Sequence, residues 1–423
     1  MNRIVLIGNG FDLAHGLKTS YADFIDWYWE QWKKKVLSSF QNIIDDGLCS
    51  IEVCKHRTQG FWAYFNYEVN IGDNKELSGY DFINFAEDFL KFKVKKCALL
   101  ASIMHDIKHQ NWVDIERIYY TLLCESLKEN SNVSHSELNK QLAALTKKLT
   151  EYLTYIENNN NEIKWNLKNA ITRKLYSPII PNDIAICASQ QRRDWIEQLK
   201  HEDSESLYYK LGDYEQYYKY LGSEITNGIK HFQKDETIVY QSFELVSKLF
   251  LPEKIMLVNF NYTNIADSYI PSKQYNQTFS INYIHGSLTN PNSIIFGYGD
   301  EKDKRYQEIE DLNDNEYLTH IKSSKYLDAS NYRKLLQFAE SAPFQIYIMG
   351  HSCGNSDRTL LNTLFEHENC VSIKPFYYKK EDGTDNYTEI AQNISRNFKD
   401  KQALRAKVVP KDCCEPLPQA STD

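Results

Sequence analysis

The clearest signal for chemistry in the sequence is a glycine turn near the start of the chain. Gly8-Asn9-Gly10 follows the apolar segment 3–7, and a third glycine, Gly16, comes a few residues later. A strand, a G-x-G turn and a helix together form the arrangement that holds a pyrophosphate at a helix N-terminus. The dinucleotide fingerprint G-x-G-x-x-G is not met, because Leu13 stands at its last position. The turn therefore predicts a phosphate site, with a purely structural tight turn as the alternative.

Polar side chains near later strand ends could act on a substrate held by this turn. His285 is suited to be a general base, because the unperturbed imidazole pKa of about 6.5 lies close to neutral pH. Asn261 can donate and accept hydrogen bonds, which suits holding a water molecule and a hydroxyl group together. The alternatives are a structural histidine at a strand end and an asparagine that caps its own turn. Asp357 is likewise either a site residue or the N-terminal cap of the following helix.

Short apolar segments rich in β-branched and aromatic residues predict the strands that position these side chains. They are 3–7, 254–258, 280–284, 293–297, 345–349 and 371–378. Such runs are typical of buried parallel strands, and helical patterns such as 357–368 follow several of them. This alternation predicts an α/β fold built on a doubly wound, mostly parallel sheet.

A long stretch with helical patterning separates the first predicted strand from the others. Apolar residues recur at helical spacing in three segments, 21–40, 81–107 and 136–156. We therefore predict a discontinuous α/β domain, residues 1–19 plus 251–400, with a large and mainly helical insertion at 20–250. The last segment, 401–423, is expected to be a flexible tail.

Composition narrows the class of protein further. The 423 residues carry a formal net charge of -8 with no long Lys/Arg cluster, so broad nucleic-acid binding is not expected. The cysteines are nine in number and irregularly spaced, which favours reduced thiols over a disulfide framework. No signal peptide is evident, and the longest apolar run, 97–104, is too short to span a bilayer. We therefore expect a cytoplasmic protein without a membrane partner.

The glycine turn resembles the opening of sirtuin-type NAD-binding domains, in which a strand precedes G-x-G-x-S-x-x-x-G-[IL]-P. The three glycines here have the same spacing, with Asp12 in place of Ser and Lys18 in place of Pro. The resemblance implies a sirtuin-like fold with NAD as substrate or ligand, and no metal cofactor is expected. It also implies the cofactor-binding residues of this turn, which are Gly8, Asn9, Gly10, Phe11, Asp12 and Gly16.

Three later segments resemble further sirtuin-type motifs in the same order along the chain. VNFNYTN (258–264) is similar to the turn whose Asn contacts the nicotinamide ribose, which implies a catalytic Asn261. Thr263 stands where that turn has Asp, and Asn259 is the alternative in a shifted register. YIHGSL resembles the strand-end His-Gly, which implies that His285 is the general base. IMGHSCGNSD resembles the turn over the adenosine, which implies binding by Gly350, His351, Ser352 and Asp357.

Together with NWVDIE (111–116), these motifs resemble the abortive-infection AbiH family of bacterial phage-defence proteins. The resemblance covers both ends of the chain and implies suicide or dormancy of the infected cell. With the sirtuin-type motifs it implies a protein that binds NAD or a related nucleotide and hydrolyses the nicotinamide–ribose bond on activation. Such an enzyme must be restrained before infection. We therefore expect a phage-derived trigger, a homo-oligomer or an inhibitory loop, for which the charged segment 299–316 is the candidate.

Two other functions compete with this interpretation. GHSCG (350–354) matches the G-x-S-x-G nucleophile elbow of serine hydrolases and lies between a predicted strand and a predicted helix. A serine hydrolase needs a late histidine, and the only histidine that follows, His367, lies on the helix directly behind the elbow. The second alternative is a non-enzymatic sensor, which binds a nucleotide through the α/β domain and a phage component through the insertion.

The remaining patterns are weaker. His105 and His109 lie one helical turn apart without an evident third metal ligand, and Cys49-x4-Cys54-x-His56 is an incomplete zinc pattern. Neither predicts a metal site. Glu116 is either a residue near the pocket or part of a solvated helix surface.

Overall fold

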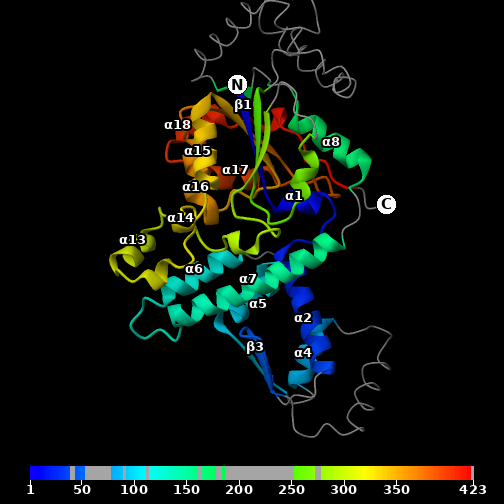
Figure 1. Ribbon diagram of the computed structural model, residues 1–423, viewed down its shortest axis with the longest axis vertical. Helices are drawn as coiled ribbons and strands as arrows, with labels where there is room; N and C mark the ends of the chain where they lie inside the picture. The colour runs from blue at the N-terminus through cyan, green and yellow to red at the C-terminus, as the bar shows by residue number, and fades with distance from the viewer. Residues whose placement is uncertain are drawn as a thin grey trace, which may run out of the picture.

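A five-stranded parallel sheet forms the centre of the protein (Figure 1). The computed structural model describes residues 1–38, 43–52, 78–88, 92–110, 114–159, 163–177, 179, 183–185, 252–271 and 278–420. The strands of the sheet are β1 (Asn2–Ile7), β5 (Lys254–Asn259), β6 (Thr278–Tyr283), β7 (Phe344–Met349) and β8 (Cys370–Phe376). Their order is β6-β5-β1-β7-β8, so the first strand of the chain lies in the middle. The predicted mostly parallel α/β sheet is confirmed.

The central strand pairs on both sides with strands from the second half of the chain. Ile4 lies opposite Met256 of β5 on one side and opposite Ile346 of β7 on the other. Every residue of β1 and of β7 is buried. A strand covered on both faces reads as a continuous apolar run, which is why these segments were recognisable in the sequence.

Helices cover both faces of the sheet. Alternate residues of β1 point to opposite faces, so Ile4 and Leu6 join one hydrophobic core, and Val5 and Ile7 join the other. The helices on the first face are α15 (Asn331–Ser341), α16 (Arg358–Phe365) and α17 (Tyr387–Arg396). Those on the second face are α1 (Asn9–Ala14) and α8 (Trp165–Leu175). Figure 1 shows the two groups on either side of β1.

The region between β1 and β5 contains further helices and a second, smaller sheet. The helices are α2 (Tyr21–Ser38), α4 (Gly79–Asp88), α5 (Ala98–Gln110), α6 (Ile115–Glu125) and α7 (His135–Asn158). Three strands form the antiparallel sheet: β2 (Ile43–Asp45), β3 (Cys49–Glu52) and β4 (Lys93–Lys96). The segment 81–107, whose apolar residues recur at helical spacing, contains parts of two helices, α4 and α5, and between them β4, which pairs with β3. The antiparallel sheet was not predicted.

These helices and strands pack around a further hydrophobic core, to which Phe296 and Tyr298 from the second half of the chain also contribute. Trp29 and Trp32 on α2 are almost fully buried in it, together with Leu142 on α7. Trp29 and Trp32 therefore pack inside the protein. Ser134 accepts a hydrogen bond from the backbone of Glu137 and caps α7, the longest described helix.

The connections that follow β6 differ from the prediction. Segment 293–297 is not a strand, and it begins at the end of the short η4 (Pro291–Ser293). Its side chains pack into two different cores. Phe296 lies in the core around α2–α7, and Ile295 lies in a core of the sheet. The apolar character of the segment thus reflects a buried connection. The segment 299–316, predicted as a charged loop, contains α13 (Lys304–Asp311) and the start of η5 (Asn315–Leu318). The other short elements of the second half are η3 (Ile265–Tyr269), α14 (Lys322–Lys325) and η6 (Asn355–Asp357).

The expectation of a flexible tail is wrong for residues 401–420. This segment forms α18 (Lys401–Lys407) and η7 (Lys411–Cys413). Val408 and Pro416 make bridges to Ile373 and Tyr377 at the edge of the sheet. Leu417 is buried in the core under the second face. Apolar residues spaced among polar ones anchor the segment, although its composition resembles that of a loose terminus.

Helices long and apolar enough to cross a membrane are absent from the described parts of the chain.

Candidate functional site

The candidate site lies where the carboxyl ends of the central strands meet. The turns after β1, β5, β6 and β7 lie at the same edge of the sheet because these strands are parallel. The chain runs outward from β1 to β5 and β6, and then returns to β7 and β8 on the other side. A reversal of strand order at one strand is the position at which open α/β sheets bind ligands.

The glycine turn at this edge is in contact with a second glycine turn. The amide of Gly8 donates to the carbonyl oxygen of Met349 over 3.2 Å, and that of Gly10 donates to the carbonyl oxygen of Gly350 over 2.8 Å. A Cβ atom on Gly10 would lie 2.9 Å from the Cα atom of Gly350. The glycines therefore allow two backbones to approach each other. The predicted phosphate site at this turn stays a prediction, and in this structure the amides of Gly8 and Gly10 donate to carbonyl oxygens.

A first polar network joins the turn after β1 to the turn after β5. Asp12 is 2 % exposed, and its two oxygens accept hydrogen bonds from Nδ2 of Asn261 (2.8 Å) and from Oγ1 of Thr263 (2.6 Å). Nδ2 of Asn261 also donates to the carbonyl oxygen of Gly8. Asn259 completes the network: its Oδ1 accepts from the amide of Asn261, and its Nδ2 donates to the carbonyl oxygen of Thr263. The network orients Asn261.

Burial sets the protonation behaviour of Asp12. It raises the pKa of this carboxyl group to about 7, although the hydrogen bonds from Thr263 and Asn261 lower it. Both amide protons of Asn261 are used, by Asp12 and by Gly8. Its Oδ1 atom is therefore the group with which Asn261 can accept a hydrogen bond from a ligand.

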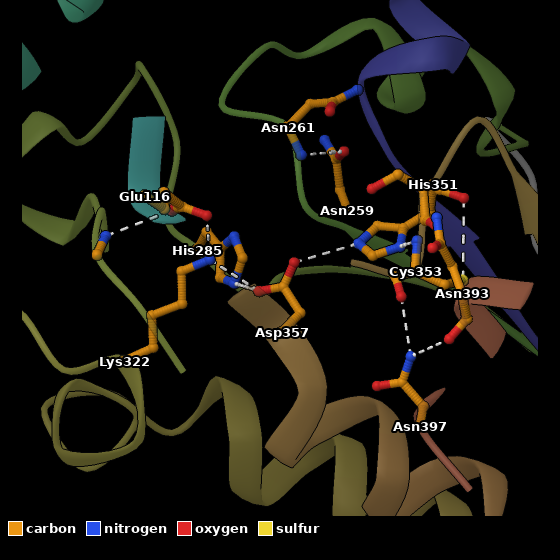
Figure 2. A network of polar contacts seen from close by, with 12 residues as sticks. Glu116, Asn259, Asn261, His285, Lys322, His351, Cys353, Asp357, Asn393 and Asn397 are labelled. Carbon is orange, nitrogen blue, oxygen red and sulfur yellow. Dashed lines mark hydrogen bonds and ion pairs between the residues drawn. The ribbon is translucent and has the colours of Figure 1, made fainter. Parts of the chain in front are cut away.

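A second network is centred on Asp357 in η6 (Figure 2). Oδ1 of Asp357 lies 2.8 Å from Nζ of Lys322 and 3.2 Å from Nε2 of His285. Oδ2 lies 3.4 Å from Nε2 of His351. Burial alone would raise the pKa of Asp357, but Lys322 and the two imidazoles hold it well below its ordinary value. Asp357 is thus an ionised acceptor of three hydrogen bonds.

The carboxylate determines the tautomers of both histidines. Nδ1 of His351 accepts a hydrogen bond from the amide of Cys353 over 3.0 Å, so Nε2 carries the proton and donates to Asp357. Nε2 of His285 faces the same carboxylate and also lies 3.2 Å from the hydroxyl of Tyr326. Nδ1 of His285 has no hydrogen-bond partner among the residues that the structure describes. Its lone pair can therefore accept a proton from a ligand or a water molecule.

The surroundings of His285 keep it neutral. Burial and the Lys322 ammonium lower its pKa, and Asp357 raises it, with a net result of about 4. The imidazole packs edge-on against Phe260, with ring centroids 5.1 Å apart. A neutral imidazole beside a carboxylate is the form in which histidine acts as a general base.

Lys322 extends the second network to the helix α6. Its Nζ atom lies 2.8 Å from Oε2 of Glu116, whose Oε1 accepts a hydrogen bond from the amide of Gly297. Burial raises the pKa of Glu116 to about 7, while Lys322 lowers it. Burial alone would lower the pKa of Lys322, but Asp357 and Glu116 raise it above its ordinary value. Glu116 is therefore part of the site, and its alternative as a solvated surface residue is wrong.

The structure gathers most of the residues proposed from the sequence, but in different roles. Asn259, Asn261 and Thr263 meet Asp12, while His285 and His351 meet Asp357. Oδ1 of Asn9 accepts a hydrogen bond from Thr19, and Phe11 is buried in the core of the second face. Gly16 has a φ of 81° and ends the α1 segment near Ala420.

Sequence reasoning did not find Lys322 or Tyr326. The segment IKSSKY holds both but has no motif, and only their spacing of four residues could have suggested a shared face. Glu116 did carry a signal, because it ends NWVDIE.

The structure also bears on the serine hydrolase motif and on the two metal-ligand patterns of the sequence. Ser352 is exposed, and Nδ1 of His367 accepts a hydrogen bond from the amide of Asn369 instead of facing this serine. The geometry therefore does not assemble a serine hydrolase triad around Ser352. His105 is exposed and pairs with Asp106, while the side chain of His109 and both Cys54 and His56 lie outside the described residues. Groups of three or more potential metal ligands are absent from the described residues.

Comparison with known proteins adds one finding. A family model described as Bacteriophage abortive infection AbiH matches residues 4–379, which is most of the chain and contains both polar networks. Neither a curated protein nor a solved structure matches the chain.

Proposed function

The chain belongs to the bacteriophage abortive infection AbiH family, and on this premise we propose that it binds NAD or a related nucleotide and hydrolyses its nicotinamide–ribose bond during phage infection. The observation that carries the proposal is the pair of His285 and Asp357 at the carboxyl edge of the sheet, with Nε2 and Oδ1 3.2 Å apart. This pair offers a neutral imidazole in a fixed tautomer. A role in abortive infection follows from the family, and the chemistry is the proposal.

The reaction assigns one step to each network. The glycosidic bond breaks through an oxocarbenium-like state, and nicotinamide leaves with the bonding electron pair. A water molecule forms the new bond to the ribose carbon, and its proton passes to Nδ1 of His285. The Asp357 carboxylate stabilises the imidazolium that forms. Oδ1 of Asn261 accepts a hydrogen bond from a ribose hydroxyl, because both protons of its Nδ2 atom are used elsewhere.

The sirtuin-like arrangement is part of the same proposal. It is supported by the order of the motifs: the glycine turn follows β1, VNFNYTN ends β5, YIHGSL ends β6 and GHSCG follows β7. Gly350 and Ser352 are proposed to face the adenosine part of the ligand, whereas His351 and Asp357 belong to the network around His285. The pyrophosphate is proposed to contact groups other than the amides of Gly8 and Gly10.

The proposed domain division is residues 1–19 plus 251–400 for the nucleotide-binding unit and 20–250 for the insertion, and the segment 401–420 packs on the first unit. The division is supported by the hydrophobic core around α2–α7, which differs from the two cores that cover the sheet. We further propose that a phage-derived trigger or self-association activates the protein. The deep burial of His285 and Asp357, 4 % and 8 % exposed, supports a resting state that must open.

Cellular NAD after phage infection tests the proposal. Hosts carry the wild type, His285→Gln or the matched control His105→Gln, whose imidazole is 70 % exposed on α5. The proposal expects NAD to fall in the wild type and the control, and to stay level with His285→Gln. Unchanged NAD in the wild type, with protection against phage intact, would rule out NAD hydrolysis.

The second candidate is a sensor that binds a nucleotide without turning it over. The burial that closes the His285–Asp357 pair also favours this candidate, because a closed site suits binding coupled to a conformational change. Calorimetric titration of the purified protein with NAD separates the two. Tight binding by both wild type and His285→Gln, with no release of nicotinamide, would support the sensor.

A further inference from the structure

The buried side chain of Lys322 connects two segments that lie far apart in the sequence. Nζ lies 2.8 Å from Oε2 of Glu116 on α6 and 2.8 Å from Oδ1 of Asp357 in η6. The side chain of Lys322 is 1 % exposed. A buried ammonium group is tolerated only with hydrogen-bonded carboxylate partners, and here two carboxylates supply them.

We infer that Lys322 is a positioning residue: its ammonium group keeps Asp357 ionised, so that Asp357 accepts hydrogen bonds from His285 and His351 and holds their tautomers. Glu116 keeps the ammonium group in place from the helix α6. The inference rests on the proposed function, because His285 is the proposed base. Lys322 takes no direct part in the proposed reaction and acts on His285 through Asp357.

The local fold supports this assignment. The amide of Lys322 donates to the carbonyl oxygen of Tyr298, which holds the start of α14 against the segment that follows 293–297. A Cβ atom on Gly299 would lie 3.1 Å from Cβ of Lys322, so glycine gives this lysine its room. Tyr326 lies one helical turn further on and places its hydroxyl 3.2 Å from Nε2 of His285. One short segment therefore brings two groups to the His285–Asp357 pair.

The charges around His285 predict what loss of the lysine does. Burial lowers the pKa of His285 most, the Lys322 ammonium lowers it next, Asp357 raises it, and His351 lowers it. When Lys322 is replaced by an uncharged residue, the carboxylates of Asp357 and Glu116 lose the cation that lies between them. A proton then binds more tightly in this cluster, including at His285.

Nitrogen NMR of the histidine rings in the full-length protein tests the inference. The spectra are recorded at pH values spanning about 4 to 6.5, for the wild type, Lys322→Met and the control Lys325→Met. Lys325 lies on the same short helix, but its side chain is 44 % exposed and pairs with Asp328. We expect wild type and Lys325→Met to keep neutral His285 protonated on Nε2 down to about pH 4, and Lys322→Met to raise the His285 pKa toward 6.5.

An unchanged pKa and tautomer of His285 in folded Lys322→Met would overturn the inference. If this variant does not fold, Glu116→Gln combined with Lys322→Met replaces it, because Gln can still accept from the amide of Gly297 without leaving a second carboxylate unpaired. A pKa of His285 at or above 6.5 in the wild type would also overturn it. These readouts need no turnover. If the expected shift occurs while no protein hydrolyses NAD, the inference stands and the proposed function fails.

Discussion

Oδ1 of Asp12 accepts a hydrogen bond of 2.8 Å from Nδ2 of Asn261, and this bond joins the turn after β1 to the turn after β5. In this structure the aspartate does not point its carboxyl group toward solvent, since it is 2 % exposed. Its effect is to orient Asn261 with Oδ1 as the available acceptor.

Replacing Asp12 by Asn tests this relationship through stability. Burial raises the pKa of Asp12 from 3.8 to about 7. Between these values the folded protein keeps a proton that the unfolded chain has lost, so this group lowers the free energy of unfolding as the pH rises. The full rise in pKa corresponds to roughly 4 kcal/mol. Urea unfolding measures the free energy of unfolding of wild type and Asp12→Asn across this pH range. This free energy should fall more steeply with rising pH in the wild type than in the variant. Equal slopes would contradict the assignment.

Asn261→Ala tests the acceptor in the proposed reaction. Removing a polar group that contacts the reacting ribose should lower kcat for NAD hydrolysis by roughly 100-fold. Nicotinamide release by the purified, activated protein measures the effect. Asn264→Ala is the matched control, because Asn264 lies in the same turn with an exposed side chain. Equal rates in the two variants would remove Asn261 from the catalytic role.

The close contact of the two glycine turns predicts that replacing Gly350 by Ala lowers the free energy of unfolding strongly. Gly350 has a φ of 75°, and a Cβ atom there would lie 2.0 Å from the amide nitrogen of Phe11. Gly383 has a similar φ of 85°, with nothing within 4 Å of the added atom. Gly383→Ala should therefore cost about 1 kcal/mol of unfolding free energy, and Gly350→Ala more than about 3 kcal/mol. Chemical denaturation measures the free energy of unfolding of both variants. Equal losses in the two variants would mean that the two glycine turns are not in contact.

The packed C-terminal segment predicts that Leu417 contributes to stability. Leu417 is 4 % exposed in the core under the second face of the sheet. Leu417→Ala should lower the free energy of unfolding by about 3 kcal/mol, because it leaves a cavity. Leu327→Ala is the control, since Leu327 is 85 % exposed and its truncation should change stability by less than about 0.5 kcal/mol. Similar small losses in both would show that the segment is loosely attached in solution.

The parallel strands of the sheet, the amphipathic helices α2 and α7 and the glycine turn could all be predicted from the amino-acid sequence. Each is a local pattern: continuous apolar runs for strands buried on both faces, helical spacing for helices, and glycine where the backbone must turn. The family could be predicted as well, because the motifs after β1, β5, β6 and β7 occur in a recognisable order.

Which polar groups meet could not be predicted from the sequence, because it depends on the folding of distant segments onto one another. The amides of Gly8 and Gly10 are occupied by carbonyl groups about 340 residues away, which no local pattern reveals. Lys322 reaches Glu116 across 206 positions and Asp357 across 35. Burial and charge pairing depend on such distant neighbours, so a lysine without a motif becomes the centre of a network. For the same reason, the apolar segment 293–297 resembles a strand in sequence and is a connection between two cores in the fold.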